Sequence, residues 1–133
     1  MLSLATLSLL LPLTLPIHSS PPAPEAAPAV TYGTVPVQGL DIFYREAGNP
    51  GAPQIVLLHG FPTSSHMFRD LIPKLAKDFH VIAPDYPGYG LSSAPSTKEF
   101  DYTFANIASI VDKVIEQRGF ERYSLYLMDY GAP

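Results

Sequence analysis

Apolar side chains recur from about residue 35 onward in short runs that are typical of strands. Residues 35–38 and 40–46 flank Gly39 and mix polar with apolar positions, which predicts two short strands joined in a hairpin. The runs at 55–58 and 79–82 are nearly continuous in apolar residues. Continuous runs of this length are typical of strands that are covered on both faces in a parallel sheet.

Apolar residues at helical spacing predict helices between these strands. A first stripe follows the capping residues 63–65 and must break or restart at Pro73, which has no amide proton to donate. A second helix is expected to begin after Thr103 and to end at Gly119. Its apolar stripe consists of Phe104, Ile107, Ala108, Val111, Val114 and Ile115. With a last alternating run at 123–128, the order predicts an α/β fold with a mostly parallel sheet and right-handed crossovers.

The composition argues against several classes of function. With 8 basic and 12 acidic residues the net charge is −4, and no basic cluster suggests nucleic-acid binding. Cysteine is absent and the four histidines lack ligand spacing, so we expect no metal. Gly88 and Gly90 match only part of a dinucleotide motif, because Ser93 replaces the third glycine. We therefore expect no cofactor, and the oligomeric state stays open.

The first quarter of the chain differs in composition from the rest. Residues 1–19 include a leucine-rich run that is too short to span a bilayer and is interrupted by prolines, which indicates a signal peptide and secretion. The alternative is a disordered hydrophobic leader on a cytoplasmic protein. Residues 20–33 are rich in proline and alanine and predict an extended linker. Residues 34–133 then form one partial globular domain.

Asp129 stands where the last predicted strand enters a turn of small residues. Gly131 and Ala132 follow it, as in a nucleophile elbow, in which a sharp turn lifts the central side chain out of the sheet. Leu127 departs from this pattern, because a small residue is usual there. The alternative interpretation is an ordinary aspartate in a turn.

Three features in order give the chain a resemblance to the N-terminal half of an α/β-hydrolase, within the epoxide hydrolase and haloalkane dehalogenase group. They are His59-Gly60-Phe61-Pro62 after one buried strand, the segment 83–92 after the next, and Asp129 at the elbow. The resemblance covers residues 37–133.

The resemblance implies roles for particular residues. Asp129 would be the nucleophile, and the backbone amides of Phe61 and Tyr130 would form the oxyanion hole. The bond between Phe61 and Pro62 would be a cis peptide, and His59 would support the loop without facing the nucleophile. A carboxylate that attacks a saturated carbon forms an ordinary alkyl ester, whereas its attack on an ester would form a mixed anhydride. Asp129 therefore suggests small alkyl electrophiles, hydrolysed without a metal or redox cofactor.

The nature of the electrophile rests on smaller differences. Haloalkane dehalogenases often hold the leaving halide with a tryptophan after the nucleophile and an asparagine where Phe61 stands, but this chain contains no tryptophan. Epoxide hydrolases commonly carry phenylalanine at that position, so we expect an epoxide, with a haloalkane as the alternative. The family's catalytic histidine, acid and lid do not follow Asp129 in this sequence. A truncated, non-catalytic fragment is thus the alternative of another class.

Overall fold

The computed structural model describes residue 26 and residues 28–132. The predicted signal peptide and part of the predicted linker lie outside these residues, and secretion stays a prediction from the sequence. No helix in the described part of the chain is long and apolar enough to cross a membrane. The same residues hold no group of three or more histidine, cysteine or acidic side chains that could bind a metal ion.

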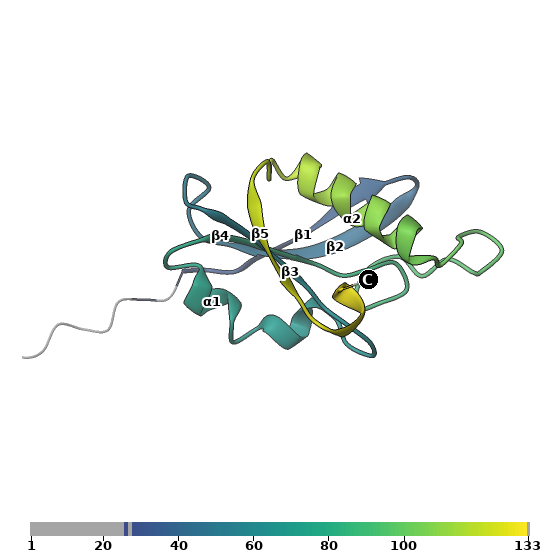
Figure 1. The fold of residues 1–133 in the computed structure, drawn as a ribbon, viewed down its shortest axis with the longest axis horizontal. Coiled ribbons are helices and arrows are strands. Elements are labelled where there is room, and N and C mark those ends of the chain that lie inside the picture. The colour runs from purple at the N-terminus through teal and green to yellow at the C-terminus, as the bar shows by residue number, and fades with distance from the viewer. Residues whose placement is uncertain (1–25, 27, 133) are drawn as a thin grey trace, which may run out of the picture.

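Five strands form one mixed sheet in the order β1-β2-β4-β3-β5 (Figure 1). Strands β1 and β2 pair antiparallel, as do β2 and β4, whereas β3 pairs in parallel with both β4 and β5. The parallel part confirms the predicted α/β architecture. The strands are β1 Thr31–Val37, β2 Leu40–Ala47, β3 Gln54–Leu58, β4 His80–Pro84 and β5 Tyr123–Leu127.

The predicted hairpin is present, although it starts earlier than expected. Gln38 and Gly39 both have positive φ, at 51° and 80°, as a two-residue hairpin turn requires. Strand β1 begins at Thr31, inside the segment predicted as linker. The pairing extends this far because β2 continues opposite it, and the Thr31 hydroxyl donates to the Glu46 carbonyl at 3.0 Å.

Helices cover both faces of the sheet. The first predicted helix is divided into a 3₁₀ helix, η1 (Ser65–Phe68), and a single turn, α1 (Ile72–Leu75). Pro73 lies in the first turn of α1, so the helix restarts there as expected. Helix α2 (Phe104–Gln117) is capped by the Thr103 side chain and is followed by Gly119 at a φ of 75°, also as predicted. Figure 1 shows α2 over one face of the sheet and α1 over the other.

The hydrophobic core has two layers, one under each set of helices. Successive residues of the central strands point to opposite faces, so Val56 and Ile82 pack beneath α2, whereas Leu57 and Val81 pack against η1 and α1. All four are fully buried. Two-sided burial confirms the interpretation of these apolar runs. Strand β5 instead lies at the edge of the described sheet, and its residues are mostly exposed.

A cluster of three hydrogen-bonded polar side chains that the sequence did not reveal lies where β4 begins, at the strand ends opposite to those that carry Asp129. Glu46 and His80 are buried in it, whereas Arg118 is partly exposed. The Glu46 carboxylate accepts a hydrogen bond from His80 Nε2 at 2.8 Å and one from Arg118 Nε at 2.9 Å. His80 stacks on Phe120, and its Nδ1 has no partner among the described residues. The cluster ties β2, β4 and the end of α2 together.

Candidate active site

Parallel pairing of β3 and β5 brings two distant loops together. The register aligns Leu58 with Leu127, so the residues that follow each strand emerge side by side. The Met128 amide donates to the Leu58 carbonyl at 3.2 Å and extends this pairing to the residue before Asp129. In open α/β sheets, ligands bind at the carboxyl ends of the strands.

One oxygen of Asp129 accepts two backbone hydrogen bonds. Its Oδ1 receives the Phe61 amide at 3.2 Å and the Tyr130 amide at 2.8 Å. No hydrogen bond reaches Oδ2 from the part of the chain that the structure describes. Asp129 has a φ of 51°, a left-handed conformation that is uncommon outside glycine and asparagine or aspartate. The three residues that the resemblance singled out therefore meet at one carboxylate.

Two glycines leave room for this sharp turn. A side chain on Gly60 would overlap the Asp129 Cβ, and a Cβ on Gly131 would lie 2.7 Å from the Leu58 carbonyl oxygen. Leu127, which departs from the expected pattern, is 45% exposed on the edge strand β5 of the described sheet. Close backbone approach thus explains why Gly60 and Gly131 are needed around Asp129.

His59 supports the first of these loops from inside the protein. Its side chain is fully buried and stacks on Tyr86, with 4.2 Å between ring centroids. The Tyr86 amide can only donate, so His59 Nε2 accepts at 3.2 Å and Nδ1 carries the proton, donated to the Gly60 carbonyl at 3.1 Å. Both nitrogens are thereby used within the protein, as expected of a side chain that supports the loop.

Burial lowers the pKa of His59 below its ordinary value of 6.5, against smaller opposing effects of the Gly60 hydrogen bond and the Asp85 charge. Between the lowered pKa and 6.5 the unfolded chain binds more protons than the folded one. The contribution of His59 to the free energy of unfolding should therefore be complete above pH 6.5 and be lost as the pH falls through the folded pKa. Denaturant unfolding across this range should show the decline.

His59→Gln is the matched variant, because a glutamine amide can also accept and donate a hydrogen bond but does not titrate. The difference between wild type and variant isolates His59 from the other histidines. Equal slopes of unfolding free energy against pH in the two proteins would contradict the assignment of the neutral form.

Asp85 has a structural role that the sequence motif did not reveal. Its side chain is 1% exposed, and its two oxygens accept the Ser65 amide at 2.6 Å and the Leu91 amide at 2.9 Å. The carboxylate joins the loop after β3 to the loop after β4. The sequence signal that could have indicated this role is an aspartate between an apolar strand and a glycine-rich loop.

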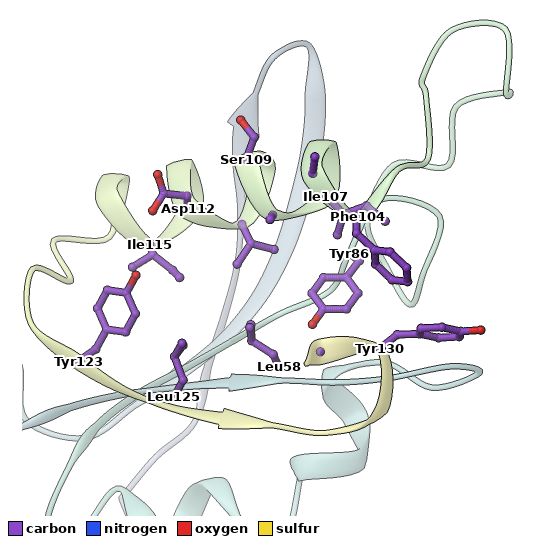
Figure 2. Close-up of a pocket in the computed structure, with 14 residues that line it drawn as sticks. Leu58, Tyr86, Phe104, Ile107, Ser109, Asp112, Ile115, Tyr123, Leu125 and Tyr130 are labelled. Atoms are coloured by element: carbon purple, nitrogen blue, oxygen red, sulfur yellow. The ribbon is translucent and has the colours of Figure 1, made fainter. Parts of the chain in front are cut away.

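Two hollows adjoin Tyr130. One has a volume of about 550 Å³ and lies between α2 and β5, with Ile115 and Tyr123 at one end and Tyr86 and Tyr130 at the other (Figure 2). The second, of about 370 Å³, is bounded by Phe61 and by further aromatic side chains, namely Tyr86, Tyr89, Tyr102, Phe104 and Tyr130. Because Phe61 and Tyr130 also supply the amides on Asp129, an apolar group could lie beside the carboxylate.

The fold and the sequence match one family over most of the folded region. Residues 53–131 match the family described as alpha/beta hydrolase fold. A crystal structure of a haloalkane dehalogenase from Bradyrhizobium elkanii superimposes with a TM-score of 0.72 at 36% identity, covering 77% of this chain and 34% of that one. The chain belongs to the α/β-hydrolase fold family.

Curated relatives with higher identity are hydrolases and dehalogenases. An uncharacterized hydrolase of Saccharomyces cerevisiae is 45% identical over 71% of this chain and 32% of its own length. A haloalkane dehalogenase of Bradyrhizobium diazoefficiens is 41% identical over 73% of this chain and 30% of its own length. Epoxide hydrolase A of Mycobacterium tuberculosis is 38% identical over 78% of this chain and 32% of its own length. The chain thus spans about a third of the length of these relatives.

Proposed function

We propose that Asp129 is the nucleophile of a hydrolase that acts on small alkyl electrophiles, most readily epoxides, through an ester on its own carboxylate. The observation that carries this proposal is the unequal environment of the two carboxylate oxygens. The Phe61 and Tyr130 amides hold Oδ1, whereas Oδ2 has no hydrogen bond from the described residues. An oxygen without hydrogen bonds on a fixed carboxylate is the one that can attack.

In the first step Oδ2 forms a bond to a saturated carbon of the substrate. The carbon–oxygen bond of the epoxide breaks, and its oxygen leaves as an alkoxide that takes a proton from a hydroxyl acid such as tyrosine. In the second step water attacks Cγ of Asp129, and the negative charge develops on Oδ1. The two amides already point at this atom, and each such donor contributes about 3 kcal/mol. Collapse then breaks the bond between Cγ and Oδ2, and the leaving alkoxide takes the proton that the base removed from the water, which releases the diol. The second proton of the water leaves the regenerated aspartic acid and restores the hydroxyl acid.

The second step needs a base that accepts the proton of the water, and in this family that base would be a histidine. His59 is committed to the Gly60 carbonyl and the Tyr86 amide. No hydrogen bond joins Asp129 to any histidine that the structure describes. The described residues therefore place no candidate for this base at Asp129.

Two observations favour an epoxide over a haloalkane. Phe61 and Tyr130 place aromatic rings beside the carboxylate, 6.1 Å apart between centroids, and neither ring carries the N–H donor with which tryptophan would hold a halide. The neighbouring hollow is lined by further aromatic residues, which suits an aryl substituent such as that of styrene oxide. Because a haloalkane dehalogenase is among the relatives, a haloalkane is the second candidate substrate.

A single turnover in oxygen-18 water tests the nucleophile. The complete gene product, in excess over styrene oxide, should incorporate one heavy oxygen into the Asp129 carboxylate, because water attacks Cγ and an original aspartate oxygen leaves in the diol. Peptide mass spectrometry after digestion measures the label.

Label that appears only in the diol would refute the ester mechanism, because water would then have attacked the epoxide directly. The same preparation tests the substrate class when it is given short haloalkanes. Halide release much faster than styrene oxide opening would reverse the ranking of the two substrates.

A further inference from the structure

The Gly60 carbonyl accepts an unusual number of hydrogen bonds. The Thr63 amide donates to it at 3.0 Å, the Thr63 hydroxyl at 2.9 Å and His59 Nδ1 at 3.1 Å. A carbonyl oxygen has two lone pairs, so three donors saturate it. This carbonyl belongs to the same peptide unit as the Phe61 amide, which donates to Asp129 Oδ1.

A peptide unit is planar, so its carbonyl and its N–H cannot be oriented independently. In the usual trans form the two groups point in opposite directions. Donors that hold the Gly60 carbonyl on one side therefore hold the Phe61 N–H toward Asp129 on the other. Hydrogen bonds to the carbonyl also polarise the peptide and strengthen its N–H as a donor.

We propose that Thr63 is a positioning residue of the active site, which aims and polarises the Phe61 amide through the Gly60 carbonyl, with His59 as the second anchor. The inference rests on the proposed function and assigns Thr63 to its second step. When water adds to Cγ of the Asp129 ester, the carbonyl electron pair moves onto Oδ1, and a histidine base takes the proton of the water. The Phe61 amide then binds a full negative charge in place of the uncharged ester carbonyl.

This charge difference predicts which step depends on Thr63. Attack by Oδ2 leaves Oδ1 as an ester carbonyl and does not increase its charge, so formation of the alkyl-enzyme should change little. Hydrolysis of the ester concentrates charge on Oδ1 and should depend on the strength of the donor.

Thr63→Val in the complete gene product removes the hydroxyl and keeps the shape of the side chain. We expect ester hydrolysis to slow by about 5- to 10-fold, while ester formation changes by less than about 2-fold. Quenched-flow mass spectrometry with styrene oxide would follow the alkyl adduct on Asp129 and should show it accumulating. A purely structural role would slow both steps or neither.

Two variants serve as controls. Thr63→Ser keeps the hydroxyl and should retain wild-type hydrolysis. The Thr63 hydroxyl also lies 3.2 Å from Met67 Sδ, so Met67→Leu removes that alternative acceptor and should leave both steps unchanged. Loss of hydrolysis in Met67→Leu as large as in Thr63→Val would assign the effect to packing and overturn the inference.

A spectroscopic measurement separates failure of this inference from failure of the proposed function. In protein labelled with nitrogen-15 phenylalanine, the proton shift of the Phe61 amide should move upfield in Thr63→Val and stay unchanged in Thr63→Ser. If the wild type forms no adduct on Asp129, the proposed function fails, and an unmoved Phe61 shift then overturns the inference as well. If the adduct forms and Thr63→Val hydrolyses it at the wild-type rate, the inference alone fails.

Discussion

Replacing Asp129 with asparagine should reduce turnover of styrene oxide by about 10⁴-fold or more, because an amide oxygen is a far weaker nucleophile than a carboxylate. No alkyl adduct should appear on residue 129 in the complete gene product. Steady-state diol formation and intact-protein mass spectrometry measure the two effects.

Asparagine is the suitable substitution because it retains the local structure. Its amide oxygen can accept the Phe61 and Tyr130 amides as Asp129 Oδ1 does, and asparagine tolerates a φ of 51°. The free energy of unfolding of the variant should therefore lie within about 1 kcal/mol of that of the wild type, since substitutions of exposed polar residues usually have effects of this size or less. Retention of more than a tenth of the wild-type rate would exclude Asp129 as the nucleophile.

Asp85→Asn should lower the free energy of unfolding by about 3 kcal/mol. The carboxylate accepts two amides, from Ser65 and Leu91, in a site that is 1% exposed. An asparagine side chain has only one acceptor oxygen, so its NH₂ group would face an amide donor and leave it without a partner. Denaturant unfolding of the complete gene product measures the loss.

Asp112→Asn provides the matched control, since the same substitution is made at an exposed position of α2. It should change the unfolding free energy by less than about 0.5 kcal/mol. Equal stabilities of the Asp85 and Asp112 variants would mean that the buried carboxylate does not hold the two loops together.

The loop after β3 carries Gly60 and Phe61, so loss of the Asp85 contacts should also slow turnover.

The secondary structure was largely predictable because its signals lie within a few residues of one another. Two-sided burial of 55–58, the restart at Pro73 and the capping residues Thr103 and Gly119 were all recognised from local pattern and are all confirmed. The sequence interpretation was wrong about where the first strand begins, since it placed the start at residue 35 and β1 begins at Thr31. The start depends on how far β2 extends opposite it.

The sequence by itself determined the type and order of the strands and helices, and it placed Asp129 in a sharp turn between small residues. Only the tertiary structure decided which groups meet there. Parallel pairing of β3 with β5 brings the Phe61 amide to Asp129 across 68 positions of chain, and the turn after β3 places the buried His59 and the exposed Thr63 at the carbonyl of the same peptide unit. Periodicity and capping are properties of neighbouring residues, whereas hydrogen bonds between loops depend on strand register and on which side chains exclude water.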